Sequence, residues 1–335
     1  MEEVTVSAKH QDLVAVVGGD TLLAREIRDL LSGASPPPRV QLLSAAGDGA
    51  AAFSNQDDEA AILAPLAAEN LEGARVAFLA GSPASSRRAF KINPPGGPVL
   101  IDATAALEER PEARLRAPWA EAVKPAVSRV QVIAHPAAIA LAMLLPRLAK
   151  IAPIRRSIVH VFEPASERGR RGLEELQKQT VAVLSFQKMQ KEVFDAQLGF
   201  NLLARYGEEA LEALELIEQR LERHLASLLA EHPGTPMPSL RLIQAPVFHG
   251  HSFSVWTEFQ QNPGARAISA ALDGSGIDVH PDEPPNHVDV AGISGLSVGA
   301  IMEDRNSPRA CWLWMAADNL KLTAENAIAV AAEIA

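Results

Sequence analysis

The chain has 335 residues, of which 47% are hydrophobic and 21% charged, a composition typical of globular proteins long enough for two domains. Its formal net charge of −10 argues against nucleic acid or an anionic membrane as a partner. A single cysteine, Cys311, excludes an internal disulfide and any cysteine-based metal site. The polar N-terminal residues and the short first apolar run do not resemble a signal peptide or a membrane span, so we expect a cytoplasmic protein.

The first part of the chain alternates short apolar runs with helical patterns, which predicts a parallel sheet with helices on its faces. The expected strands cover residues 13–17, 39–43, 76–82 and 99–105, and residues 93–98 and 111–125 are expected to be loops. Gly18 follows the first strand and opens a loop that leads into a helix. Folds that bind a dinucleotide hold its pyrophosphate at such a turn, although an ordinary strand-to-helix turn has the same outline.

The stretch from Val132 to Ala140 joins a short apolar strand to a helix through a turn that contains Pro136. A turn of this kind presents the first helical residues and their N–H groups to a ligand. Nucleophiles often stand there, because the helix dipole lowers the pKa of a thiol. Here the presented positions are alanines, so the turn has the frame of a nucleophile site without the nucleophile.

The rest of the chain predicts a mixed α and β region. Strands are expected over residues 156–162, 298–304 and 311–315, and a closing helix from residue 320 to residue 335. Residues 207–232 carry regularly spaced leucines and predict one long amphipathic helix, with Leu211 on its apolar face. Cys311 alternates with core residues and is expected to be a structural thiol.

These segments resemble the aspartate-semialdehyde dehydrogenases, and most of all the Usg-type bacterial paralogues of that family. The family's active-site segment reads roughly Ile-Ala-Asn-Pro-Asn-Cys-Ser-Thr, and Ala138 takes the place of its catalytic Cys. The resemblance implies an α/β fold with a Rossmann-like dinucleotide-binding domain, residues 1–134 plus 318–335. It also implies an α+β catalytic-like and dimerisation domain, residues 135–317, with the C-terminal helix returning to the first domain.

The same resemblance assigns the remaining positions of the pocket. Glu163 stands where the family has a Gln that orients the acyl intermediate, and Gln244 stands where an Arg binds the substrate carboxylate. His251 matches the acid–base His, and Glu208 matches a Glu that meets the substrate amine. His135 replaces an Asn of the active-site segment, and the two phosphate-binding positions read Glu108 and Leu211. We expect no metal site.

The positions that would meet a dinucleotide are Gly18, Thr21, Ala24, Ser44, Gly81 and Asn319. Thr21 replaces the second Gly of the motif, whose missing Cβ lets the backbone approach a phosphate. Asp48 follows the second strand, where the family selects the 2′-phosphate of NADP with Ser and Arg. The sequence therefore leaves NADP, NAD and no dinucleotide open as cofactor assignments.

Because the losses touch every role in the pocket, the sequence predicts a protein on an amino-acid-biosynthesis scaffold that has lost thioester-forming dehydrogenase activity. Loss of a covalent nucleophile costs on the order of 10⁶-fold in rate. The first hypothesis is a homodimeric pseudo-enzyme that binds a small molecule or a protein. The alternative is an enzyme: either an NAD(P)-dependent semialdehyde dehydrogenase in which water or hydroxide attacks in place of a thiol, or a changed reaction with His251 and Glu163 as acid and base. Nucleotide binding, and turnover before and after Ala138→Cys, would discriminate between them.

Overall fold

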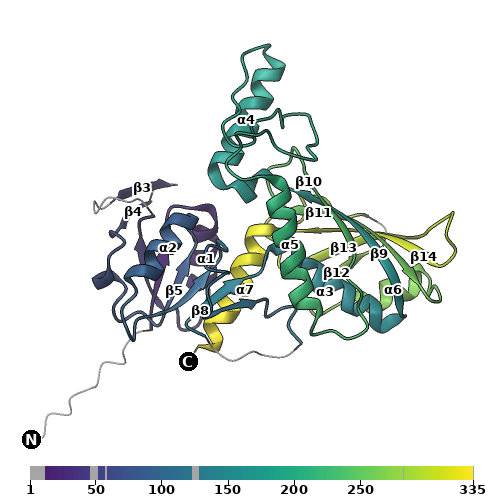
Figure 1. The fold of residues 1–335 in the computed structure, drawn as a ribbon, viewed down its shortest axis with the longest axis horizontal. Helices are drawn as coiled ribbons and strands as arrows, with labels where there is room; N and C mark the ends of the chain where they lie inside the picture. The colour runs from purple at the N-terminus through teal and green to yellow at the C-terminus, as the bar shows by residue number, and fades with distance from the viewer. Residues whose placement is uncertain (1–11, 46–51, 57–58, 123–127, 282, 335) are drawn as a thin grey trace, which may run out of the picture. The chain divides into compact units, whose positions relative to one another are not determined.

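The computed structural model describes residues 12–45, 52–56, 59–122, 128–281 and 283–334 (Figure 1). Asp48 lies outside the described residues. The chain divides into two compact units: one holds Met1–Arg114, Val127–Val132 and Ala327–Ala335, and the other Leu115–Ala126 and Ile133–Asn326. The domain boundaries expected from the sequence stay a prediction.

The first unit is built on a six-stranded sheet with the order β2-β1-β5-β6-β8-β7. Its strands are β1 (Leu13–Val17), β2 (Arg39–Leu43), β5 (Val76–Leu79), β6 (Val99–Asp102), β7 (Ala113–Arg116) and β8 (Val130–Ile133). The sheet is parallel from β2 through to β8, which confirms the predicted class. Strand β7 corrects the sequence prediction, because it lies inside the polar stretch 111–125 that was expected to be loop only.

The remaining elements of the first unit are two helices, a hairpin and one short turn of 3₁₀-helix. They are α1 (Leu22–Ser32), α2 (Pro83–Ile92), β3 (Ala52–Gln56), β4 (Glu59–Leu63) and η1 (Ala68–Asn70). Helix α1 follows β1 and helix α2 follows β5, as the alternating pattern requires.

Two glycines allow the β1–α1 turn to approach the end of β5. Gly18 has φ +86°, and a Cβ at this position would lie 2.3 Å from the Cα of Gly81. A backbone atom cannot move aside as a flexible side chain can, so only glycine fits at position 18. Thr21 then caps α1: its Oγ1 accepts from the N–H of Ala24 at 3.1 Å and donates to the carbonyl of Ala80 at 2.8 Å.

The second unit is built on a six-stranded mixed sheet with the order β10-β9-β11-β14-β13-β12. Its strands are β9 (Ile154–Glu163), β10 (Ser239–Gln244), β11 (His251–Phe259), β12 (Ile277–His280), β13 (Leu296–Glu303) and β14 (Ala310–Ala317). Helices α3 (Pro136–Ile151), α5 (Leu214–Leu229) and α6 (Ala265–Leu272) pack on one another and against one face of this sheet. In β9 the buried residues Ser157, Val159 and Val161 alternate with more exposed ones, as in a sheet covered on one face.

The predicted long helix over residues 207–232 is wrong at its start, because α5 begins only at Leu214. Residues before it are held by a different part of the chain: the N–H of Gly207 bonds to the carbonyl of Phe194, and that of Glu209 bonds to the Asp195 carboxylate. A Cβ at Gly207 would lie 2.1 Å from Asp195 Oδ2. Leu211, expected on the buried helix face, is therefore an exposed loop residue.

That loop is held by helix α4 (Gly169–Leu184), which follows the short η2 (Ala165–Arg168) and stands away from the mixed sheet (Figure 1). The buried carboxylate of Glu175 accepts from the N–H groups of Glu192, Val193 and Phe194. The segment between α4 and α5 is thus held by hydrogen bonds to a side chain of α4 and not by the backbone bonds of a helix.

Helix α7 (Asn319–Glu333) closes the chain, and its part from Ala327 belongs to the first unit, as predicted. There the guanidinium of Arg75 donates to the carbonyls of Ala331 and Ile334 and forms an ion pair with Asp12. Among the described residues, no helix is both long enough and apolar enough to cross a membrane.

Candidate functional site

His135 occupies the turn that the sequence pattern singled out, and it caps helix α3. Its Nδ1 accepts from the N–H of Ala137 at 3.2 Å, and its own N–H donates to Nδ1 of His224 at 3.0 Å. Pro136 at the first helical position has no N–H to satisfy, which suits a helix start. The free edge of the His135 ring, Nε2, therefore points away from the helix.

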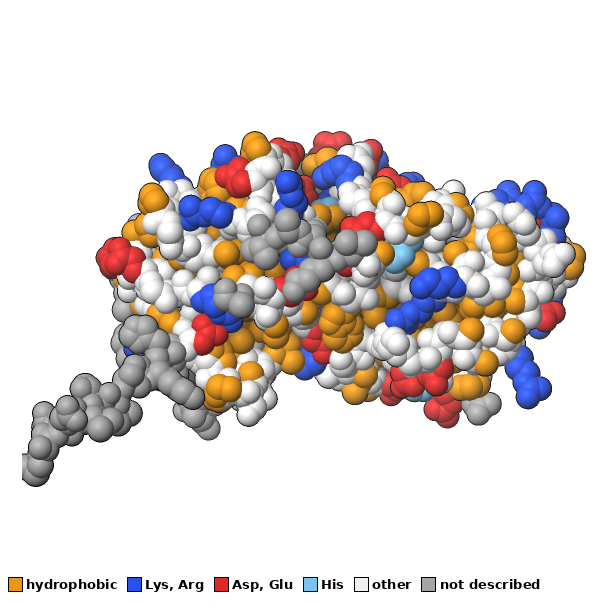
Figure 2. All heavy atoms as spheres, turned by 90° about the horizontal axis from the view of Figure 1, so that it is seen from below, with side chains coloured by type: hydrophobic (Ala, Val, Ile, Leu, Met, Phe, Trp, Pro, Cys, Tyr) orange, Lys and Arg blue, Asp and Glu red, His pale blue; other side chains and the backbone are white. Residues whose placement is uncertain are grey.

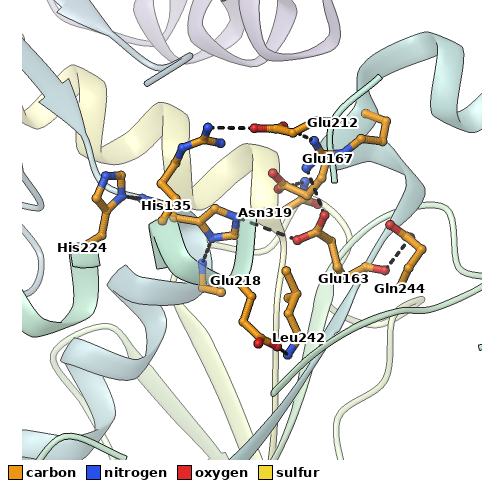
Figure 3. A network of polar contacts seen from close by, with 12 residues as sticks. His135, Glu163, Glu167, Glu212, Glu218, His224, Leu242, Gln244 and Asn319 are labelled. Carbon is orange, nitrogen blue, oxygen red and sulfur yellow. Dashed lines mark hydrogen bonds and ion pairs between the residues drawn. The ribbon is translucent and has the colours of Figure 1, made fainter. Parts of the chain in front are cut away.

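Glu163 ends strand β9 and is fully buried. Its Oε1 accepts from Nη2 of Arg168 at 3.0 Å, and Nη1 of Arg168 bonds to Glu212 at 3.0 Å. Its other oxygen, Oε2, lies 3.8 Å from Nε2 of His135 and is drawn facing that ring in Figure 3. One half of the carboxylate is thus fixed by an arginine, and the other half faces a histidine.

His251 begins strand β11 and completes the group. Its ring lies edge-on to the His135 ring with the centroids 5.7 Å apart. One ligand atom from each of His135, Glu163 and His251 lies within 4.8 Å of the other two. His135 Nε2, Glu163 Oε2 and His251 Nε2 are buried and have no hydrogen-bond partner within the described part of the chain.

Burial decides the charge of this cluster. Desolvation lowers the pKa of His251 to about 3, and the positive charge of Arg168 acts in the same direction. Desolvation, with His251 close by, also lowers the pKa of His135 well below its usual value. Desolvation raises the pKa of Glu163 to about 7 against the opposing effect of Arg168. Both imidazoles are therefore neutral near pH 7, where Glu163 titrates.

Gln244 lies beside Glu163, but its side chain is already engaged. Its Nε2 donates to the backbone carbonyls of Glu163 at 2.8 Å and of Ala245 at 3.1 Å, and its Oε1 accepts from the hydroxyl of Tyr206. The residue is fully buried. An amide whose donors and acceptor are all used inside the protein cannot also bind a substrate carboxylate.

Ala138 lies in the first turn of α3 and is fully buried. Cys311 cannot serve in its place. On β14 it is opposite Thr257, whereas Ala317 is opposite His251, so six residues of strand, about 20 Å, separate the two levels. Cys311 is also buried, its Sγ contacts Asn262, and burial raises the pKa of its thiol.

The predicted nucleotide-facing residues Gly18, Thr21, Ala24, Ser44 and Gly81 belong to the first unit. Gly18, Thr21 and Gly81 meet at the ends of β1 and β5, and Ala24 is buried in α1. Ser44 is buried at the end of β2, and its N–H bonds to the carbonyl of Ala64. Their nucleotide contacts stay a prediction.

Asn319 and Glu208 differ from each other in burial. Asn319 is buried; its Oδ1 accepts from Gly250 N–H and Ser166 Oγ, and its Nδ2 donates to Glu167. Glu208 is exposed and lies in the loop before α5 instead of at a helix N-terminus. It is therefore not part of the buried cluster.

Sequence reasoning missed Arg168, Glu212 and Tyr206, and it considered His135 only as a lost Asn. Arg168 could have been noticed, because a basic residue five positions after an unexpected Glu163 offers that carboxylate a counter-charge. Nothing in the sequence connects Tyr206 to Gln244, since the contact depends on the loop before α5.

With this geometry in place, the chain can be compared with known proteins. Residues 144–322, just over half of the chain, match the family described as semialdehyde dehydrogenase, dimerisation domain. The aspartate-semialdehyde dehydrogenase of Prochlorococcus marinus is 26% identical, covering 95% of this chain and 94% of the relative. A USG-1 protein homolog of Pseudomonas aeruginosa is 34% identical over 47% of each chain.

Solved structures agree. A probable aspartate-semialdehyde dehydrogenase from Pseudomonas aeruginosa has a TM-score of 0.84 at 26% identity, covering 97% of this chain and 98% of that one. The Candida albicans enzyme crystallised with NADP has a TM-score of 0.69 at 16% identity over 97% and 98%, which shows a shared fold. The fold is therefore that of the semialdehyde dehydrogenases. The chain belongs to the aspartate-semialdehyde dehydrogenase family, and USG-1 homologs are among its relatives.

Proposed function

We propose that this protein is a homodimeric member of the family that does not carry out thioester-forming dehydrogenation and acts by binding. The observation that carries the proposal is Gln244. Both its amide donors and its carbonyl oxygen bond to protein groups, so the position that would hold a substrate carboxylate is closed. Ala138 has no lone pair with which to attack a carbonyl, and Cys311 lies on a distant part of the sheet.

The open face of the mixed sheet supports a second copy of the chain as one partner. Helices α3, α5 and α6 cover one face, whereas the other face carries large apolar side chains at alternating positions of β9, β13 and β14. These side chains are Ile158, Phe162, Met302, Trp312 and Trp314. Uncovered apolar area of this kind marks an interface, and the matching family is named for dimerisation.

The same face carries a cavity of about 540 Å³, lined in part by Trp312, Trp314 and His287. His287 Nε2 lies 3.1 Å from Ser252 Oγ at its edge. Because the cavity lies on the face proposed for dimerisation, we assign it to the subunit interface.

On the face drawn in Figure 2, basic and acidic side chains are interspersed with apolar ones and form no single basic area.

The proposal is compatible with binding of NADP or NAD by the first unit. Thr21 adds a side chain where the motif has glycine, but its hydroxyl caps α1 through Ala24 and donates to Ala80, so it folds back onto the protein. A dinucleotide would then meet the turn of Gly18 and Gly81. A cytoplasmic location is part of the same proposal.

A second candidate function rests on the pKa of Glu163. A buried carboxyl that titrates near pH 7 beside a neutral His251 suits a general base that activates water. Such a site could oxidise a hydrated aldehyde with NAD(P) and without a thiol. Its activity would depend on Glu163, whereas the first proposal expects no turnover.

The test is a restoration series assayed with aspartate semialdehyde, phosphate and NADP. The wild type and Ala138→Cys are both expected to be inactive, because a thiol alone lacks the carboxylate-binding arginine and the neutral amide. The triple variant Ala138→Cys/Glu163→Gln/Gln244→Arg restores the thiol, the neutral amide and the arginine together. It tests whether this fold supports the family's reaction when all three groups are present. Turnover by the wild type that Glu163→Gln abolishes would support the second candidate and overturn the first.

A further inference from the structure

We propose that His135, Glu163 and His251 form a binding site for a divalent transition-metal ion of the Zn²⁺ class. The three side chains come from the start of α3, the end of β9 and the start of β11, all within the second unit. Two imidazoles and one carboxylate are a known donor set for zinc with an open fourth position. The proposal deepens the binding role proposed above by naming a ligand.

The strongest support is that three buried polar atoms face one another without partners. His135 Nε2, Glu163 Oε2 and His251 Nε2 are each buried and lack a hydrogen bond among the described residues. Buried polar atoms are nearly always paired, so a group of three points to a missing ligand. A hydrogen bond between His135 and Glu163, now 3.8 Å apart, would satisfy two of them and leave His251 unpaired. One ion satisfies all three.

The distances suit an ion after a small contraction. The three donor atoms lie within 4.8 Å of one another, and donors around tetrahedral zinc are roughly 3.3 Å apart for bonds of 2.0–2.1 Å. Binding therefore requires the donor atoms to close by up to ~1.5 Å. Three protein ligands leave one position for water or a small anion.

The surroundings fit an outer shell. Arg168 holds Glu163 Oε1 at 3.0 Å, so Oε2 alone is left for the ion, and such partners orient ligating carboxylates. Arg168 and Arg220 both pair with Glu212. Glu167 bonds to Asn319, and both residues are labelled in Figure 3. Two arginines and three carboxylates, when ionised, leave one net negative charge around the donors, which a dication meets favourably.

His135 must change its proton position when it binds. Its Nδ1 now accepts from Ala137 N–H at 3.2 Å, which places the proton of the neutral ring on Nε2. Coordination through Nε2 moves that proton to Nδ1 and gives up this long contact. Metal binding therefore replaces one weak hydrogen bond of His135 with a coordinate bond. A histidine that served only as a helix cap would keep the hydrogen bond from Ala137.

The experiment uses the full-length untagged protein, stripped with a chelator and titrated with ZnCl₂ by calorimetry and with CoCl₂ by visible absorption. We expect one Zn²⁺ per chain and the intense visible bands of four-coordinate Co²⁺. His251→Ala and Glu163→Gln should each weaken binding by more than ~100-fold, because loss of an outer partner alone costs 10–100-fold. His280→Ala is the matched control, because it removes a half-exposed histidine 3.2 Å from Asp278 and should change nothing.

Two measures guard against misfolded variants. His135→Asn keeps a good helix cap while removing the imidazole, and it should also lose the metal. Each variant is melted without metal to establish folding, and Zn²⁺ should then raise the melting temperature of the wild type and His280→Ala only.

No Zn²⁺ binding by the wild type, which would leave water as the occupant, overturns the proposal. So does binding that survives all three cluster variants, or that His280→Ala abolishes. The turnover assay can find the wild type inactive, or active without a thiol, whether or not Zn²⁺ binds. The metal proposal and the proposed function can therefore be refuted independently.

Discussion

Nε2 of His135 and Oε2 of Glu163 lie 3.8 Å apart, and both are buried and unpartnered within the described chain. In the family pattern these positions hold two neutral amides beside a thiol. Here a histidine and a carboxylate face each other instead, and Arg168 balances the carboxylate from its other side. The cluster thus presents a buried carboxylate and two imidazoles instead of the neutral amides that the resemblance implies for the family.

Gly18→Ala should destabilise the first unit strongly. The added Cβ meets the backbone of Gly81 at 2.3 Å in a residue with φ +86°, so both clash and backbone strain contribute, about 2–5 kcal/mol together. Gly73→Ala is the control: φ is +78° but nothing lies within 4 Å, so only about 1 kcal/mol is expected. Urea unfolding measures both, and equal losses would contradict the close approach.

Tyr206→Phe should lower the free energy of unfolding by about 1–3 kcal/mol, because it leaves the buried Oε1 of Gln244 without its donor. If the two side chains are coupled as described, adding Gln244→Met to Tyr206→Phe should cost less than the sum of the single changes. Additive losses in a double-mutant cycle would show that Gln244 is not held by Tyr206.

Glu175→Gln should loosen the segment that leads from α4 to α5. The buried carboxylate accepts three backbone N–H groups, of Glu192, Val193 and Phe194, and the amide offers one acceptor oxygen fewer. We expect faster hydrogen exchange at these amides and a loss of about 1–3 kcal/mol. The exposed neighbour Glu174→Gln should leave exchange unchanged. Unchanged protection in Glu175→Gln would refute this account of the loop.

The Asp12–Arg75 pair gives a pH-dependent contribution to stability. The hydrogen bond from Arg75 lowers the pKa of Asp12, against a smaller opposing effect of burial. A carboxyl with a lowered folded-state pKa stabilises above its unfolded pKa and loses that contribution as pH falls through the folded value. Because the Asp12 side chain is 46% exposed, solvent screening limits the effect to about 0.2–1 kcal/mol.

Asp12→Asn should accordingly be less stable than the wild type at pH 7 and equal to it in strong acid, as measured by thermal melts across pH. Asp20→Asn, at an exposed carboxylate in the same unit, is the control that should show little difference. A gap between wild type and Asp12→Asn that widens as the pH falls would contradict the assigned sign.

Local patterns were enough to predict much of the fold. The apolar run at Leu13–Val17, the turn at Pro136 and the closing helix after Asp318 all formed as expected, because each depends on periodicity and turn chemistry within a few residues. The helix expected from Gly207 failed because tertiary contacts to Asp195 and the backbone near it outcompeted helical bonds.

The sequence anticipated which residues lie together, and their roles stay a prediction. Matching motifs placed Glu163, Gln244 and His251, and the structure puts Glu163 and His251 in one cluster with Gln244 alongside. The roles of His135 and Arg168 depend on which atoms are left unpaired after folding, and no spacing in the sequence records that.

The most direct test of the central claim, that the family's thiol chemistry is absent, combines turnover with the mass of the intact protein. Wild-type protein is mixed with NADP and aspartate semialdehyde, and NADPH formation and protein mass are followed together, with and without phosphate. We predict no NADPH above the enzyme-free rate and no acyl adduct, because Cys311 is buried about 20 Å along the sheet from His251. An acyl adduct on Cys311, or phosphate-dependent NADPH formation, would contradict the account.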